Sequence, residues 1–404
     1  MSMAGKRVVI LGATGSIGDT TFRVLDNLGD EFRVVGLSAG DRVEQLVRRA
    51  RACKPEAVCI ADGAQVEGVR SQLPGVRVLS GPEGLSQLAA LDGADVVVNG
   101  LVGAVGLRPT LEALKAGKTV AMANKEPLVM AGGLVLQAAA EGGGALLPVD
   151  SEPNAMWQCL RGESASAVRS LFLTASGGAF RGWTREQMIT VTPAQALDHP
   201  TWRMGSKITV DCATLMNKGF EVIEASLLFD VDIDQVKVVV HRESVVHSMV
   251  EFVDGAILAH LGKTDMSLPI QYALTHPKRR PAPMDTLDLV GLGALHFEEP
   301  DLLAFPALEL CYEAGRTGGT APAVLNAADE VAVEGFLRGE IGFLDIHEVN
   351  RHTLGAHIPG PADSLAEVLA ADEEGRRLAR EHVTVVRGMP SGRATARAVG
   401  PGEE

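Results

Sequence analysis

The sequence lacks the cysteine patterns that mark a disulfide framework or a zinc ribbon. Its cysteines are odd in number and contain no C-x-x-C pair; they are Cys53, Cys59, Cys159, Cys212 and Cys311. Unpaired cysteines are typical of a reducing compartment, so we expect a cytoplasmic protein. The N-terminus agrees, because Lys6 and Arg7 lead directly into a predicted strand and no secretory signal fits before it.

The sequence also lacks a long apolar run and an excess of basic residues. Although 46% of the residues are hydrophobic, no run approaches the roughly 18 apolar residues that a membrane-spanning helix requires. The 37 basic and 51 acidic residues give a net charge of -14. This balance disfavours nucleic acid and anionic membranes as partners. A small phosphorylated molecule remains compatible, because a few local basic groups can bind one phosphate.

The chain of 404 residues fits two or three domains. Residues 1–150 alternate between strands and helices such as Ser16–Leu28 and Arg108–Ala116, which predicts an α/β fold with a doubly wound, Rossmann-like parallel sheet. The expected strands are Arg7–Leu11, Phe32–Leu37, Ala57–Ala61, Val76–Leu79, Asp95–Asn99, Thr119–Ala123 and Ala145–Val149.

The pattern changes near Asp150. Residues 151–280 predict an α+β connecting catalytic domain with a helix over Asn217–Phe229; its expected strands are Ser170–Thr174, Lys207–Val210, Lys237–Val240 and Ser248–Val253. Proline-rich residues 281–300 indicate a linker. Residues 301–387 predict a C-terminal helical domain, and residues 388–404 a flexible tail.

A glycine-rich loop, Gly12–Gly18 (G-A-T-G-S-I-G), follows the first strand and opens a helix. Glycines allow a tight turn and let backbone N–H groups approach a pyrophosphate at the helix N-terminus. The segment therefore indicates dinucleotide binding, although a purely structural turn is the alternative. Gly40, Asp41 and Arg42 end the second strand. Small residues and Arg42 favour a 2′-phosphate and hence NADP, whereas Asp41 favours NAD.

Two polar segments follow predicted strands, Asn124-Lys125-Glu126 and Asp150-Ser151-Glu152. Ligands of doubly wound sheets bind at this carboxyl edge, although each segment alone could be a turn or a helix cap. Further along, Asn217, Lys218 and Glu221 share one side of a predicted helix. A solvated helix face is the alternative there. Asp150, Glu152 and Glu221 make an all-oxygen set that suits Mg²⁺ or Mn²⁺ better than zinc.

Two loops complete the candidate site. Ser176-Gly177-Gly178 ends a predicted strand, and its glycines allow a ligand to approach closely. Residues 198–205 combine His199, Trp202 and Met204 with Gly and Pro. A lone His or Trp is usually a packing residue, but this group in a loop is more typical of a lid.

These motifs, taken in order, resemble the 1-deoxy-D-xylulose 5-phosphate reductoisomerase family. They are G-A-T-G-S-I-G, N-K-E, D-S-E, S-G-G, H-P-x-W-x-M-G and A-T-L-M-N-K-G-x-E, and the resemblance runs from Arg7 to about residue 385. It implies a homodimeric NADPH-dependent enzyme that converts its substrate to 2-C-methyl-D-erythritol 4-phosphate for isoprenoid precursors. It also implies a divalent metal, either Mg²⁺ or Mn²⁺, with Co²⁺ as an alternative.

The resemblance assigns roles to residues. Metal ligands would be Asp150, Glu152 and Glu221, and Lys125 would act with them in catalysis. Substrate contacts would be Lys125, Ser151, Glu152, Ser176, His199, Asn217 and Lys218. We add Trp202 of the closing loop, the metal ligand Glu221, and Cys212, for which a buried packing residue is the alternative. Cofactor contacts would be Thr14, Gly15, Ser16, Ile17, Gly40, Asn124, Glu126 and Gly205. Asp41 and Arg42 are added to this set from their place at the end of the second strand and not from the resemblance.

Three positions depart from the family pattern. Cys212 stands where a phosphate-binding Ser is usual, Asp41-Arg42 replaces a segment that usually ends in Asn, and Asp329 replaces a common Asn. We expect no catalytic consequence from Asp329. Two other functions remain open: a two-domain NADP-dependent dehydrogenase that needs no divalent metal, and an NADPH-binding regulator without turnover.

Overall fold

The computed structural model describes residues 5–388. The chain forms two compact units, each built from several segments: the first comprises Met1–Phe172, Leu227–Asp230 and Val245–Ala294, and the second comprises Leu173–Ser226, Val231–Ser244 and Leu295–Glu404. The predicted tail lies outside the described residues except for Gly388, which ends the last helix. No helix in residues 5–388 is long and apolar enough to cross a membrane.

The first unit is built on a seven-stranded sheet in the order β4-β3-β2-β1-β5-β6-β7, and every neighbouring pair is parallel. Its strands are β1 Lys6–Leu11, β2 Phe32–Ala39, β3 Ala57–Ile60, β4 Arg77–Ser80, β5 Val96–Asn99, β6 Thr119–Met122 and β7 Ala145–Pro148. The run Val8–Leu11 is fully buried, as expected for a strand with helices on both faces. The predicted doubly wound parallel sheet is confirmed.

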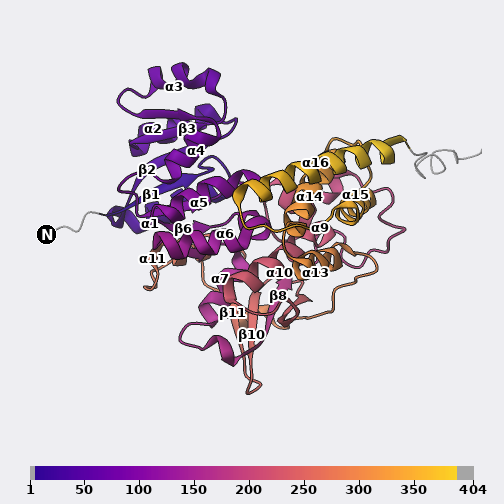
Figure 1. Ribbon diagram of the computed structural model, residues 1–404. Helices are drawn as coiled ribbons and strands as arrows, with labels where there is room; N and C mark the ends of the chain where they lie inside the picture. The colour runs from indigo at the N-terminus through magenta and orange to yellow at the C-terminus, as the bar shows by residue number, and fades with distance from the viewer. Residues whose placement is uncertain (1–4, 389–404) are drawn as a thin grey trace, which may run out of the picture. The chain divides into compact units, whose positions relative to one another are not determined.

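Helices follow the strands of this sheet (Figure 1). They are α1 Ser16–Leu28, α2 Val43–Cys53, α3 Val66–Gln72, α4 Gly81–Ala89, α5 Leu107–Lys115, α6 Glu126–Gly142 and α7 Ser151–Cys159, and α11 Ser267–Thr275 and α12 Leu289–Leu292 come from the later part of the chain. The apolar stripe of α2 over Val43, Leu46 and Val47 is buried in the core. Short 3-10 turns η1 to η4 cover Gly29–Glu31, Gly63–Gln65, Gly103–Gly106 and Ala165–Ala167.

A second sheet has four strands in the order β11-β10-β8-β9. Its strands are β8 Val168–Ala175, β9 Val236–Val240, β10 Val246–Phe252 and β11 Ile257–Leu261, and a 3-10 turn, η5 Ile233–Gln235, precedes β9. The first three strands match the predicted ones, whereas β11 was not predicted. This strand pairs antiparallel with β10 and lies at an edge of the sheet.

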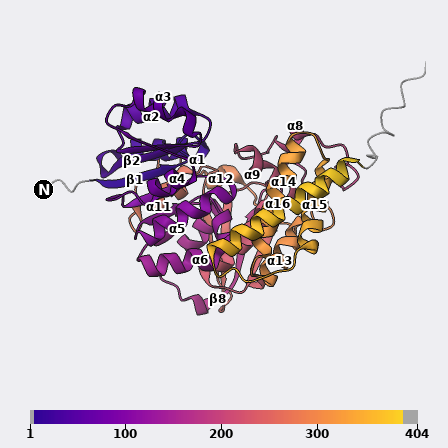
Figure 2. The ribbon, with the colours of Figure 1, turned by 45° about the horizontal axis from the view of Figure 1, so that its top comes forward.

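The remaining helices are α8 Pro193–Ala196, α9 Ser206–Thr214, α10 Met216–Phe229, α13 Ala307–Thr317, α14 Ala321–Leu337, α15 Phe343–Ala356 and α16 Leu365–Gly388. Helices α14, α15 and α16 pack against one another (Figures 1 and 2). The prediction of a strand at Lys207–Val210 was wrong, because these residues lie in α9. A run of four residues with alternating polarity is too short to separate a strand from one helical turn.

The glycine loop after β1 depends on a close contact at Gly18. A methyl group on Gly18 would lie 2.3 Å from the carbonyl oxygen of Ala13. We therefore expect Gly18→Ala to lower the free energy of unfolding by about 1–3 kcal/mol, because backbone must move to make room. Gly133→Ala in α6 is the matched control, since no atom lies within 4 Å of the added carbon. It should be neutral or stabilising by up to about 1 kcal/mol. Urea unfolding measures both, and equal effects would contradict the close-contact argument.

Candidate active site

The glycine loop lies at the carboxyl end of β1, beside the end of β2. Gly12 has a φ of +75° and its N–H donates to Ser38 Oγ at 3.0 Å. An added Cβ on Gly12 would lie 2.6 Å from the carbonyl oxygen of Gly100, so this turn requires glycine. Helix α1 starts at Ser16 with Gly15 as its N-cap. Its first N–H groups are thus available to an anionic ligand.

The predicted cofactor segment after β2 is exposed. Gly40, Asp41 and Arg42 all face solvent between β2 and α2. The β2 end is tied to the glycine loop by the Ala13 N–H, which donates to the Ser38 carbonyl at 2.7 Å. The two sequence-predicted cofactor segments are therefore neighbours. Of the loop residues, Thr14 is buried, whereas Ser16 is exposed.

The Asn-Lys-Glu segment follows β6, and its outer two residues are hydrogen-bonded to the loop after β5. Asn124 Nδ2 donates to the Gly103 carbonyl at 3.3 Å, and Glu126 Oε1 accepts from the Gly103 N–H at 3.2 Å. Asn124 also donates to Glu126. These contacts hold the edge of the sheet around Lys125, which is itself only 5% exposed.

Lys125 meets Asp150 at the ends of two adjacent strands. The Lys125 ammonium lies 2.5 Å from Asp150 Oδ2, and Asp150 Oδ1 accepts from the Ser151 N–H at 3.0 Å. Asp150 is thus the N-cap of α7. One of its carboxylate oxygens caps the helix, and the other binds Lys125. Ser151 Oγ donates to Glu152 at 2.7 Å.

The polar side of α10 is buried, so the alternative of a solvated helix face is wrong. Asn217, Lys218 and Glu221 are 7%, 5% and 1% exposed. Asn217 Nδ2 donates to Glu221 Oε1 at 2.6 Å, and Lys218 forms an ion pair with the other oxygen of the same carboxylate. Burial of charged groups in this arrangement is costly unless each is paired or binds a ligand.

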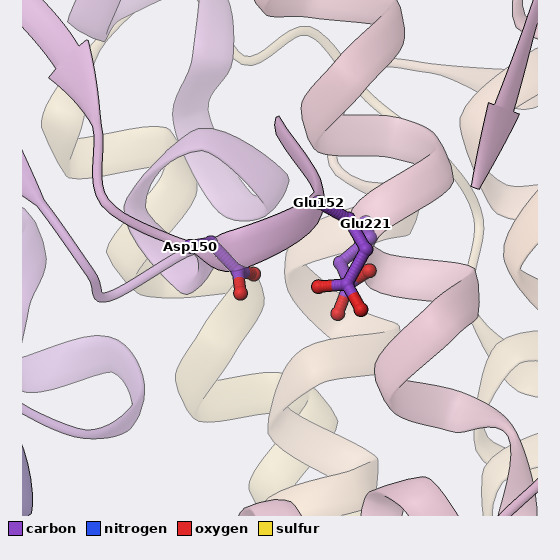
Figure 3. A group of neighbouring side chains, drawn as sticks. All are labelled: Asp150, Glu152 and Glu221. Carbon is purple, nitrogen blue, oxygen red and sulfur yellow. The ribbon is translucent and has the colours of Figure 1, made fainter. Parts of the chain in front are cut away.

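The three carboxylates that the sequence suggests as metal ligands form one group. Asp150, Glu152 and Glu221 each offer an oxygen, and these oxygens lie within 4.8 Å of one another (Figure 3). Glu152 is partly buried and the other two are buried. An all-oxygen donor set with three negative charges fits Mg²⁺ or Mn²⁺ and does not resemble a zinc site.

Ser176, at the end of β8, bonds to His199 in the second unit. His199 Nδ1 accepts from the backbone N–H groups of Thr201 and Trp202 at 3.2 and 2.9 Å. The proton of the neutral ring must therefore be on Nε2, which donates to Ser176 Oγ at 2.9 Å. Burial lowers the pKa of His199 to about 4, which keeps the ring neutral at physiological pH.

The hydroxyl of Ser176 is oriented by two donors. Its oxygen accepts from His199 Nε2–H and, at 3.2 Å, from the Gly178 N–H. Because both lone pairs are engaged, the hydroxyl proton is left to donate elsewhere. A further contact of this loop was not predicted: the Arg181 guanidinium donates to the Ser176 carbonyl at 2.6 Å. In the sequence, the signal for this contact was a basic residue shortly after the double glycine.

Cys212 lies in α9, near the helix end, rather than at the start of the helix that carries Asn217 and Lys218. Leu215, with a φ of +64°, separates the two helices. Gly178 packs directly on Cys212, since an added Cβ would lie 2.5 Å from the Cys212 carbonyl oxygen. The predicted phosphate residue is therefore next to the Ser176–Gly178 loop.

The loop of residues 198–205 joins α8 to α9. Trp202 and Met204 are partly buried, and Gly205 is the N-cap of α9. Asp329, to which we assigned no role, is fully buried and lies 2.7 Å from the Lys207 ammonium at the start of α9. Asp211 shares the same ammonium at 2.6 Å. The departure at residue 329 thus contributes to the packing of α9.

Three segments of the chain match models of known protein families. Residues 8–132 match the family model described as 1-deoxy-D-xylulose 5-phosphate reductoisomerase. Residues 146–229 and 261–378 match the models of two C-terminal domains of the same enzyme.

Named relatives and solved structures agree over most of the chain. The 1-deoxy-D-xylulose 5-phosphate reductoisomerase of Exiguobacterium sibiricum is 50% identical, covering 92% of this chain and 97% of its own. That of Chloroherpeton thalassium is 48% identical over the same shares. The Zymomonas mobilis enzyme in complex with NADPH matches with a TM-score of 0.88 at 42% identity, over 94% and 99% of the two chains. A reductoisomerase complex with NADPH, fosmidomycin and magnesium gives 0.90 at 38% identity, over 95% and 99%. With identity at this level over nearly its whole length, the chain belongs to the 1-deoxy-D-xylulose 5-phosphate reductoisomerase family.

Proposed function

We propose that the protein catalyses the NADPH- and metal-dependent rearrangement and reduction of 1-deoxy-D-xylulose 5-phosphate to 2-C-methyl-D-erythritol 4-phosphate. The observation that carries this proposal is the carboxylate cluster of Asp150, Glu152 and Glu221, with Lys125 bonded to Asp150. A simple NADP-dependent dehydrogenase has no use for such a cluster. Membership of the family supports the same reaction.

Asp150, Glu152 and Glu221 would hold a Mg²⁺ or Mn²⁺ ion. Bound there, the ion would supply Lewis-acid polarisation of the substrate oxygens. Lys125, held by Asp150, would donate to the oxygen on which negative charge develops while the carbon skeleton rearranges. Ser151, bonded to Glu152, would orient that carboxylate and the neighbouring substrate hydroxyl.

NADPH would bind along the carboxyl edge of the parallel sheet and supply the hydride. The Gly12–Gly18 loop and the first turn of α1 fit its pyrophosphate, and exposed Arg42 fits the 2′-phosphate. Asn124 and Glu126, through their bonds to Gly103, would fix the edge against which the cofactor lies.

The substrate phosphate would bind in the second unit, at Ser176, Asn217 and Lys218. Ser176 has both lone pairs occupied by donors, so its proton points outward to an acceptor. Lys218 adds positive charge, and Cys212 beside Gly178 would line the same pocket. Trp202 would cover the site from the 198–205 loop and exclude water.

The first prediction concerns turnover and the metal. The protein should oxidise NADPH when given 1-deoxy-D-xylulose 5-phosphate with Mg²⁺ or Mn²⁺, and a chelator should abolish this. Asp150→Asn, Glu152→Gln and Glu221→Gln should each lower kcat at least about a hundredfold, because each removes a charged metal ligand. NADPH affinity should persist, and exposed Glu313→Gln is the matched control with normal kcat. Chelator-resistant turnover would exclude the reductoisomerase assignment and favour a simple dehydrogenase.

The second prediction concerns His199, which would keep Ser176 oriented toward phosphate. The folded-state pKa of about 4 is below the ordinary 6.5, so folding favours the neutral ring. The stability linked to His199 is therefore complete above pH 6.5 and is lost as the pH falls from 6.5 toward 4. NMR titration of labelled histidines, assigned with His199→Gln, should place its midpoint near 4. A midpoint near 6.5 would mean that the ring does not hold these hydrogen bonds in solution.

We also infer that the protein is a homodimer that pairs through β11. This edge strand exposes apolar side chains, with Ile257 at 52%, Leu258 at 45% and Leu261 at 38%. Among the described residues no strand pairs with its outer edge, and an exposed apolar edge of this kind favours association. A second copy of the chain is the occupant that matches, because the same strand can pair with itself across a twofold axis.

The five free cysteines support a cytoplasmic location.

The third prediction tests this interface. Leu258→Lys should shift the protein toward the monomer in sedimentation analysis, because two lysines would face each other across the paired edge. Val385→Lys is the matched control, since Val385 is a similarly exposed apolar residue, at 51%, on α16. A dimer unaffected by Leu258→Lys would place the interface elsewhere, and a monomeric parent protein would exclude it.

A further inference from the structure

The loop Ser176–Gly178 is held on both sides by contacts within the second unit. On one side Arg181 Nη1 donates to the Ser176 carbonyl at 2.6 Å. On the other, Gly178 packs against the backbone of Cys212. The loop conformation, and with it the direction of the Ser176 hydroxyl, thus depends on Arg181 as well as on His199.

Gly177 is what allows Arg181 to reach this carbonyl. Its φ is +83°, and an added Cβ would lie 2.8 Å from Arg181 Cδ and 2.9 Å from Cγ. The aliphatic part of the arginine side chain therefore lies against the glycine backbone. At Gly177 the arginine side chain therefore leaves no room for another side chain.

Arg181 is a partly buried cation without a carboxylate partner. Among the described residues, no Asp or Glu oxygen lies within ion-pair distance of its guanidinium. The nearby acid Glu243 is engaged by His296 Nδ1 at 2.6 Å and His241 Nδ1 at 3.1 Å. Burial, and then the positive charge of Arg242, lowers the pKa of Arg181, while the negative charge of Glu243 raises it by a smaller amount. The guanidinium stays protonated.

A partly buried charge that has no direct ion-pair partner is unfavourable in the ligand-free protein. It becomes favourable when a dianion binds nearby, because the anion supplies the missing partner. The neighbouring Arg242 is also a cation, and it is paired with Glu298. Arg181 thus places a cation without a direct ion-pair partner beside the Ser176–Gly178 loop, an arrangement that favours an anionic ligand there.

We propose that Arg181 is a positioning residue for the substrate phosphate, acting through the Ser176–Gly178 loop. This inference rests on the proposed function, whose phosphate site it extends. Arg181 fixes the loop so that the Ser176 hydroxyl points to the phosphate. Its charge raises the affinity of the loop for a dianion.

The test compares Arg181→Gln, which removes the charge, with Arg181→Lys, which keeps the charge but loses the planar donor group. In the full-length enzyme with NADPH and Mn²⁺, Arg181→Gln should raise the KM for substrate roughly tenfold to a hundredfold, the usual effect of losing a charge-assisted contact. Arg181→Lys should have a smaller effect. The kcat and the KM for NADPH should change less than about threefold in both variants.

Inorganic phosphate gives a second readout that a loss of stability alone would not change. It should inhibit the parent enzyme competitively with substrate, and its inhibition constant should rise in parallel with the KM in Arg181→Gln. Arg185→Gln, four residues further along and paired with Glu348 at the surface, is the matched control with unchanged constants. If Arg181→Gln does not fold, Arg181→Lys carries the same comparison.

The outcomes separate the two proposals. An unchanged KM and an unchanged phosphate inhibition constant in the folded variants would overturn the role of Arg181 while the enzyme activity stands. A fall in kcat without a change in KM would also overturn it, since that pattern indicates general disturbance of the site. If the parent protein does not turn over the substrate, the proposed function fails. Protection of the parent protein by inorganic phosphate against thermal unfolding, absent in Arg181→Gln, would still support phosphate binding at Arg181, and equal protection would overturn it.

Discussion

Mutual repulsion between three carboxylates is the constraint on which the site depends. Asp150, Glu152 and Glu221 hold oxygens within 4.8 Å of one another, and like charges at such distances in a buried setting are unfavourable. Each carboxylate has its own donor: Lys125 for Asp150, Ser151 for Glu152, and Asn217 with Lys218 for Glu221. These donors reduce the repulsion without removing the net negative charge, and the charge that is left favours a divalent cation.

The same principle of paired burial recurs away from the carboxylates. Asn99 Nδ2 donates to Thr110 Oγ1 at 2.9 Å beneath the edge of the parallel sheet. Lys207 is shared by Asp211 and Asp329, and Asn350 donates to Asp329 at 3.2 Å. Removing one member of such a network leaves a buried charge or dipole without its partner, which costs more than the hydrogen bond itself contributes. The loops that would contact ligands are thereby attached to rigid elements.

Local patterns predicted much of this protein, and their failures have physical causes. Alternating strands and helices gave the parallel sheet, because strands buried on both faces are continuous apolar runs. The segment Lys207–Val210 was assigned to a strand because three of its four residues are β-branched, and packing against α14 decided for a helix. β11 was missed because its apolar side chains are exposed and adjoin the turn Asp254-Gly255, so no buried pattern marks it. The solvated-face interpretation of α10 failed because polarity alone does not report burial.

What the sequence by itself determined is the set of chemical groups and the order of the elements that carry them. The glycine loop, the two polar segments at strand ends and the α10 motif are short-range signals, readable from spacing. Only the tertiary structure decided which groups meet. It joined Lys125 to Asp150, turned the polar side of α10 inward, fixed the protonated nitrogen of His199, and placed Arg181 on Gly177. These contacts depend on distances between residues that are set by packing of the whole chain, and spacing along the sequence does not encode such distances.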